Sequence, residues 1–89
     1  MLVDSHCHLD FPDFADERDA IVARALAAGV GRMVTISTRV RRFDEIRAIA
    51  EAYEQVYCSV GTHPHSAAEE PDVTAEELIA LAAHPKVVA

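Results

Sequence analysis

Three side chains that can bind a metal ion or transfer a proton lie two residues apart near the start of the chain: Asp4, His6 and His8, in the stretch VDSHCHLD. Alternate residues of a β-strand face the same side, so these three are expected to share one face of a strand. Polar groups gathered on one face need a compensating partner when they are buried. Two imidazoles in this arrangement suit a divalent cation, and two solvated histidines at the end of an edge strand are the alternative.

A second histidine group, His63 and His65, follows another apolar, strand-like run in the stretch VGTHPH. If the sheet is parallel, both histidine groups open on the same edge, where parallel α/β enzymes place their sites. Imidazoles there can bind a substrate phosphate, orient a water molecule or carry a proton near neutral pH. A loop shaped by Gly61 and Pro64, with solvated histidines, is the alternative.

The elements that must position these histidines alternate along the chain. Apolar periodicity predicts an α/β fold of parallel βαβ units with right-handed crossovers. Gly29 is expected to end the first helix, and Thr74 with Glu77 forms a capping-box pattern at the start of the third. The strands are expected at residues 2–8, 33–37, 56–60 and 86–89, and the helices at 16–28, 43–53 and 75–83.

The remaining polar side chains have ordinary structural interpretations. Asp10 and Asp13 are expected to cap the first helix, although they could also reach the site. Glu69, Glu70 and Asp72 precede the third helix and suit its positive N-terminal end. A solvated surface position is expected for the others, with phosphate contact as an alternative for the arginines and capping for the histidine: Arg39, Arg41, Arg42 and His84.

The formal net charge of −7 argues against a general basic surface for nucleic acid or for a membrane. It does not exclude a phosphate substrate, because a bound divalent metal supplies local positive charge. No stretch approaches the roughly 20 apolar residues of a membrane span, and the start lacks a signal-peptide pattern. Cys7 and Cys58 are too few for a disulfide framework, so both are expected to be buried thiols, with Cys7 packing and not ligating. A cytoplasmic protein is expected.

Three stretches, LVDSHCHLD, VGTHPH and HPKVVA, together resemble the TatD family of metal-dependent hydrolases, within the amidohydrolase-like group. The resemblance covers residues 1–89. It implies a (β/α)₈ barrel, a fold of typically about 250 residues, of which this chain would supply three βα units and the start of strand four. It also implies two divalent metal ions (Zn, Mn or Mg) and hydrolysis of DNA phosphodiester bonds, often as a 3′→5′ exonuclease.

By the same resemblance, His6 and His8 are ligands of one metal, and His65, with His63 near it, lies on the substrate side. In two-metal hydrolysis one ion lowers the pKa of a bound water, and the pair stabilises the attacking and leaving oxygens. The family's bridging glutamate would follow Ala89, and further ligands would come later. Residues 1–89 are therefore expected to be a partial domain, inactive or nearly so by itself.

Two other interpretations remain open from the sequence. Another barrel hydrolase with an H-x-H motif, such as a PHP-type phosphoesterase or an amidohydrolase acting on C–N bonds, would use the same first motif. A non-catalytic binding or scaffold protein is the alternative from a different class. It would need self-association to cover its open strand edges.

Overall fold

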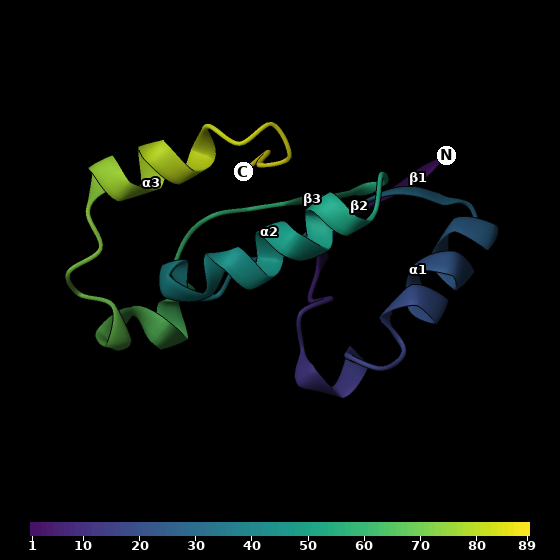
Figure 1. Ribbon diagram of the computed structural model, residues 1–89, viewed down its shortest axis with the longest axis horizontal. Coiled ribbons are helices and arrows are strands. Elements are labelled where there is room, and N and C mark those ends of the chain that lie inside the picture. Colours follow the sequence, from purple (N-terminus) through teal and green to yellow (C-terminus); the bar gives the residue numbers. More distant parts are fainter.

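A computed structural model describes all of residues 1–89. Each of three strands is followed by a helix, as Figure 1 shows, so the predicted alternation is confirmed. Short 3-10 helices occupy three of the connections: η1 (Pro12–Phe14), η2 (Val40–Arg42) and η3 (Pro64–Glu69). The strands are β1 (Leu2–Cys7), β2 (Val30–Thr35) and β3 (Val56–Cys58), and the helices are α1 (Arg18–Ala27), α2 (Phe43–Ala52) and α3 (Ala75–Ala82).

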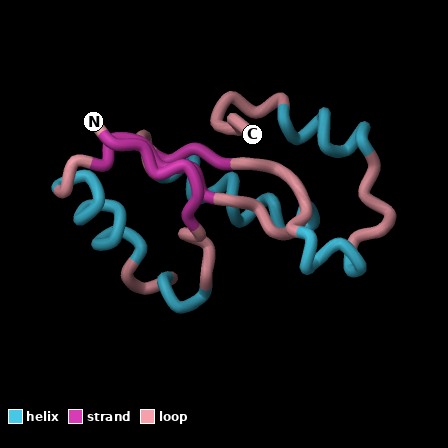
Figure 2. Tube along the Cα trace, turned by 180° about the vertical axis from the view of Figure 1, so that it is seen from behind, coloured by secondary structure: helices cyan, strands magenta, loops and turns pink.

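The strands form one sheet in the order β1-β2-β3, and both pairs are parallel. Figure 2 shows them side by side, with the helices outside them. The predicted fourth strand is present as a single parallel bridge between Cys58 and Val87, at the other edge of β3. The Cys58 N–H donates to the carbonyl of Lys86 at 2.9 Å, and the Val88 N–H donates to the carbonyl of Cys58 at 2.9 Å.

The core lies where α2 crosses the sheet. Phe43, Ile46 and Ile49 recur every third residue, so one face of α2 is apolar and packs against the strands. Phe43 and Ile46 are each 2% exposed, and burial of each contributes about 1.5–3 kcal/mol. Opposite them, Val56 and Cys58 of β3 are fully buried. This contact fixes α2 on the sheet, and with it the β2–α2 connection at the C-terminal edge.

The second strand begins and ends earlier than residues 33–37. Gly29 ends α1, as predicted, with a φ of 100° that favours glycine, and the chain then turns directly into β2. The Ile36 N–H still donates to the Cys7 carbonyl of β1 at 2.8 Å, but the Ser37 N–H donates to the Ser59 hydroxyl at 3.0 Å. A serine side chain thus replaces a strand partner there. Strands β2 and β3 both end at the C-terminal edge of the sheet, where the site is expected.

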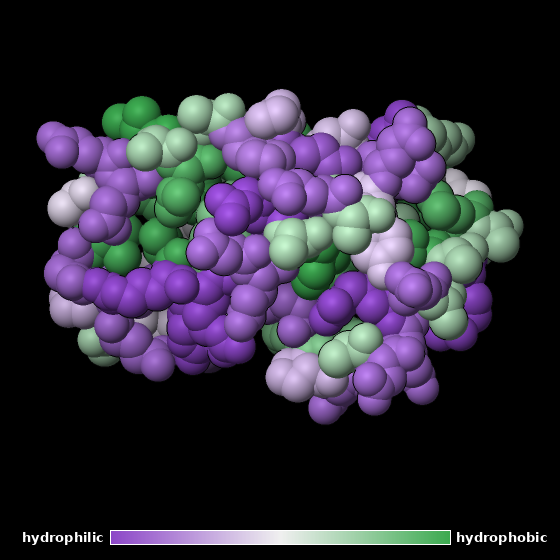
Figure 3. Space-filling model, in the orientation of Figure 1, coloured by the Kyte–Doolittle hydropathy of each residue, from purple (hydrophilic) through white to green (hydrophobic).

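Apolar surface remains uncovered at two places. Residues Leu2 and Val3 of β1 are 65% and 56% exposed, whereas β2 and β3 carry buried positions. Helix α3 starts as predicted, with the Glu77 N–H donating to the Thr74 hydroxyl at 3.2 Å, but its Ile79 is 71% exposed. Figure 3 shows apolar surface at the α3 end of the molecule. None of the helices is long and apolar enough to cross a membrane.

Candidate metal and phosphate site

The two histidine groups meet at the C-terminal edge of the sheet. His8 follows β1 directly, His63 follows β3, and both line one hollow of about 280 Å³. We call it the histidine hollow, and its lining residues are His8, Phe11, Thr38, Arg39, His63 and Ser66. A parallel sheet brings these segments together because all its strands end at the same edge.

The first histidine pair is compact. The ring centroids of His6 and His8 are 5.1 Å apart with planes at 78°, and the His8 ring stacks on Phe11 at 4.8 Å and 17°. The Nδ1 atom of His8 is buried and has no hydrogen-bond partner. Asp4 turns toward its own strand, since its Oδ1 accepts the His6 N–H at 3.1 Å. An unpaired buried nitrogen beside a second imidazole is what a metal-binding position supplies.

Cys7, between the two histidines, packs against the core and faces β2. Its Sγ donates to the carbonyl of Val34 at 3.4 Å. Burial, with help from the carboxylates of Asp4 and Asp10, raises the pKa of the Cys7 thiol to about 11. Cys58 is fully buried, burial likewise raises its pKa, and both thiols are free. A protonated thiol at this position is a packing group.

His63 is held by its own backbone and by its neighbour. Its N–H donates to the carbonyl of Thr38 at 2.9 Å, and its Nδ1 accepts the N–H of His65 at 3.1 Å. In the neutral ring the proton therefore resides on Nε2. The His65 ring lies 5.0 Å from His63, but His65 is exposed and does not line the hollow. Of the two histidines predicted on the substrate side, the structure brings only His63 to the hollow.

These donors fit part of a metal site. Structural and catalytic zinc sites use three or four protein ligands, and imidazole also suits other divalent metals. His6 and His8 supply two adjacent imidazoles. No group of three or more His, Cys, Asp or Glu side chains within residues 1–89 lies close enough to hold an ion. Within residues 1–89 the two imidazoles therefore fall short of a complete metal site.

Glu70 has a role that the sequence did not reveal. It was expected at the N-terminal end of α3, but its carboxylate is buried among the loops instead. It accepts the N–H groups of Val40 at 2.8 Å and Arg41 at 2.9 Å, and the Thr62 hydroxyl at 2.6 Å. Burial alone would raise the pKa of Glu70, but these hydrogen bonds lower it below its usual range. Glu70 therefore ties the β3–α3 connection to the start of α2.

The three arginines after β2 point into three different places. Arg39 lines the histidine hollow and pairs with Glu69 at 3.0 Å. Arg41 pairs with Asp72, and their hydrogen bond lowers the pKa of the Asp72 carboxyl. Asp72 therefore contacts η2, whereas the sequence predicts it at the N-terminal end of α3. Arg42 pairs with Glu45 at 3.1 Å. All three ion pairs lie at the surface, as the solvated-surface interpretation expects, and Arg39 alone also borders the histidine hollow.

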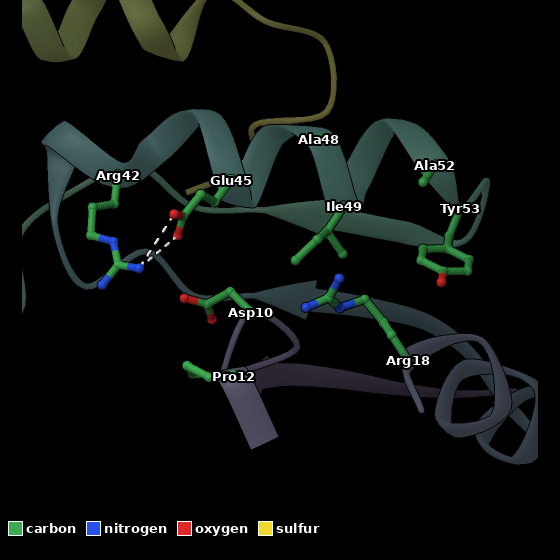
Figure 4. Close-up of a pocket in the computed structure, with 9 residues that line it drawn as sticks. All are labelled: Asp10, Pro12, Arg18, Arg42, Glu45, Ala48, Ile49, Ala52 and Tyr53. Atoms are coloured by element: carbon green, nitrogen blue, oxygen red, sulfur yellow. Dashed lines mark hydrogen bonds and ion pairs between the residues drawn. The ribbon is translucent and has the colours of Figure 1, made fainter. Parts of the chain in front are cut away.

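Asp10 and Asp13 do not cap α1. The N-cap residue of α1 is Glu17, that of η1 is Phe11, and neither start has a side-chain cap. Asp10 instead borders a second hollow of about 440 Å³ between the first loop and α2, opposite the Arg42–Glu45 pair (Figure 4). Its Oδ1 is buried without a partner. A 3-10 turn at Pro12 moves both aspartates away from the helix end.

His84 follows α3, contacts α2 and does not line the histidine hollow. Its Nε2 lies 3.0 Å from a carboxylate oxygen of Glu51 on α2, and its Nδ1 accepts the Lys86 N–H at 3.0 Å. The Lys86 amine donates to the carbonyls of Tyr53 at 3.1 Å and Glu54 at 2.9 Å, just beyond the C-terminal end of α2. The His84 side chain thus joins the turn after α3 to α2, and its hydrogen bonds do not cap a helix end.

Comparison with known proteins agrees with this geometry. The chain is 40% identical over 76 residues to a protein named "uncharacterized metal-dependent hydrolase YjjV" from Escherichia coli K12, covering 85% of this chain and 29% of the relative. It is 36% identical over 88 residues to the 3′-5′ ssDNA/RNA exonuclease TatD of Escherichia fergusonii, covering 99% of this chain and 34% of the relative. The chain thus spans about a third of the length of these relatives.

A crystal structure of YjjV, a TatD homologue from Escherichia coli K12, superposes with a TM-score of 0.86 at 39% identity, over 99% of this chain and 35% of the other. The predicted fold class is confirmed: three parallel βα units that correspond to the first part of a (β/α)₈ barrel. The model of the family described as TatD related DNase matches residues 3–89. The chain therefore belongs to the TatD-related DNase family.

Proposed function

We propose that the full-length gene product is a metal-dependent hydrolase that cleaves phosphodiester bonds of DNA, as a 3′→5′ exonuclease. The observation that carries this proposal is the contact between the exposed His6 ring and the His8 ring, whose buried Nδ1 has no partner and which lines one hollow with His63. The names of the TatD relatives, which describe exonucleases of single-stranded DNA and RNA, support the choice of substrate. DNA is the expected partner, and a cytoplasmic location stays a prediction.

His6 and His8 would hold one of two divalent ions, which are Zn, Mn or Mg by the chemistry of the donors. Such ions, when bound, activate water and neutralise charge on the phosphate. His63 would contact the substrate phosphate through Nε2, since its Nδ1 is already occupied by the His65 N–H. His65 would help only indirectly, by holding that ring in place.

Residues 1–89 alone are expected to be inactive or nearly so. Two imidazoles do not complete a catalytic metal site, and no third ligand lies near them in this chain. The chain also spans only about a third of the TatD relatives, at 34% of their length. Divalent-metal-dependent nuclease activity of the purified 89-residue chain would contradict this expectation.

The test uses the full-length gene product with variants His6→Ala and His8→Ala, and His84→Ala as a control outside the hollow. We expect His6→Ala and His8→Ala each to lose bound Mn²⁺ or Zn²⁺, measured by elemental analysis after gel filtration. We also expect the rate at which each cleaves labelled single-stranded DNA to fall more than about 100-fold. Changing a residue that only supports a metal ligand typically lowers activity by about 10- to 100-fold, and removing the ligand itself should lower it further. His84→Ala should keep both properties.

Polarity and substrate class come from the same assay. A label at the 5′ end should yield a ladder of progressively shorter products, and a label at the 3′ end should be released at once as mononucleotide. Matching RNA and DNA oligonucleotides distinguish the two substrates. Retention of metal and of cleavage by both histidine variants would contradict the proposed site.

A further inference from the structure

The three arginines of the β2–α2 connection share a sequence segment but not an environment. Arg42 borders the second hollow, and Arg41 borders a groove beside α3. Arg39 alone lines the histidine hollow. A phosphate that reaches the histidines therefore meets one arginine and not three.

Arg39 is the one permanently charged side chain among the residues that line the histidine hollow. The chain carries a net charge of −7, so an anionic ligand is attracted to this position by local charge and not by the overall field. The hydroxyl-bearing residues Thr38 and Ser66 line the same hollow and add hydrogen-bonding groups. A planar guanidinium beside hydroxyls matches the oxygens of a phosphate group.

The backbone that carries Arg39 is fixed on both sides. The carbonyl of Thr38 accepts the His63 N–H at 2.9 Å, and the carboxylate of Glu70 accepts the N–H groups of Val40 and Arg41. The Arg39 side chain, in contrast, is 35% exposed and pairs with Glu69, which is 55% exposed. An exposed ion pair contributes little to stability, so exchange of the Glu69 carboxylate for another anion costs little.

Building on the proposed function, we infer that Arg39 binds a backbone phosphate of the nucleic-acid strand in the histidine hollow, and that Glu69 competes with this phosphate for the guanidinium. Removal of the arginine therefore weakens strand binding, and removal of the Glu69 carboxylate strengthens it. Two substitutions at one ion pair have opposite effects. A purely structural ion pair would show no such opposition.

The test measures binding of a fluorescein-labelled oligothymidylate to the full-length gene product in EDTA, by anisotropy at several NaCl concentrations. Arg39→Gln should weaken binding about tenfold, the effect of losing a hydrogen bond to a charged group. It should also lower the slope of log K against log salt by about 0.7, the contribution of one phosphate contact on a single strand. Glu69→Gln should tighten binding by up to about fivefold.

Matched controls come from the same segment. Arg42→Gln removes an arginine that faces the other hollow and should leave affinity and salt slope unchanged. Arg39→Lys keeps the charge and should retain the salt slope, which guards against a folding defect in Arg39→Gln. Circular dichroism of each variant checks the fold.

The outcomes separate this inference from the proposed function. If the wild type binds and cleaves the oligonucleotide while Arg39→Gln behaves like Arg42→Gln, the role of Arg39 is refuted and the nuclease proposal stands. If Glu69→Gln weakens binding, the competition is refuted. If the wild type neither binds the strand nor cleaves it with Mn²⁺, both proposals fail together.

Discussion

Substitution of Glu70 by glutamine tests the claim that one buried carboxylate joins two loops of the site. Glutamine has the same shape, but it replaces one acceptor oxygen with an NH₂ donor. Oε1 of Glu70 accepts from Val40 and Thr62, and Oε2 accepts from Arg41. If the amide oxygen keeps the first two partners, its NH₂ group must face the Arg41 N–H.

The expected cost follows from these contacts. The hydrogen bond from the Arg41 N–H is lost, and this N–H then faces the glutamine NH₂ group, which is also a donor. Glu70→Gln should therefore destabilise the fold by about 2 kcal/mol. Glu69→Gln is the matched control, because the neighbouring carboxylate is 55% exposed and forms only a surface ion pair. Its effect on unfolding should stay within about 0.5 kcal/mol.

Stability should also depend on pH at this residue. The pKa of Glu70 is lower in the folded chain than its usual value, so its stabilising contribution is complete above about pH 5. That contribution is lost as the pH falls through the lowered folded pKa. The difference in unfolding free energy between wild type and Glu70→Gln should therefore narrow under acid conditions.

The assay is urea unfolding of the full-length gene product, with hydrogen exchange of the Val40 and Arg41 amides as the local readout. Both amides should exchange faster in Glu70→Gln and not in Glu69→Gln. Equal urea midpoints and equal amide protection in the two variants would refute the bridging role of Glu70.

Three further predictions concern the core and its supports. Ile46→Ala should lower the free energy of unfolding by about 3 kcal/mol, because Ile46 is 2% exposed and its loss leaves a cavity, whereas an unchanged urea midpoint would show that α2 does not pack as described. Lys86→Met should cost about 1 kcal/mol by removing the donor to two carbonyls beyond the end of α2, and thermal melts that coincide with wild type would contradict this. Cys58 should resist iodoacetamide at pH 8 in the native protein and react in urea, because burial keeps its thiol protonated and inaccessible; mass spectrometry of native Cys58 showing rapid labelling would contradict its burial.

The fold could be predicted largely because its signals are local. The spacing of Phe43, Ile46 and Ile49 identified α2, and Gly29 and Thr74 marked helix ends through backbone conformation and capping. Strand ends were less predictable. They depend on tertiary hydrogen bonds such as Ser37 N–H to the Ser59 hydroxyl, which no local pattern encodes.

The position of the site could be predicted from the sequence, because it depends on which strand ends lie together. His8 and His63 could be placed at one edge because parallel strands end together, and the structure brings both to the hollow. Glu70 and Arg39 could not be assigned from sequence, since a charged residue in a loop gives no sign of which loop it contacts. Glu70 contacts the N–H groups of Val40 and Arg41, and the Val40 contact spans 30 positions of the chain.

The order of strands in the sheet, β1-β2-β3 and then the bridge at Val87, is also the order in which the residues are synthesised. Each strand after β1 can therefore pair with a strand that is already made. Each pairing still spans a helix, as from Leu2 to Val30, so it forms more slowly than a hairpin, although it can follow the order of translation. In that order, every residue that lines the histidine hollow, from His8 to Ser66, is synthesised before α3 begins at Ala75.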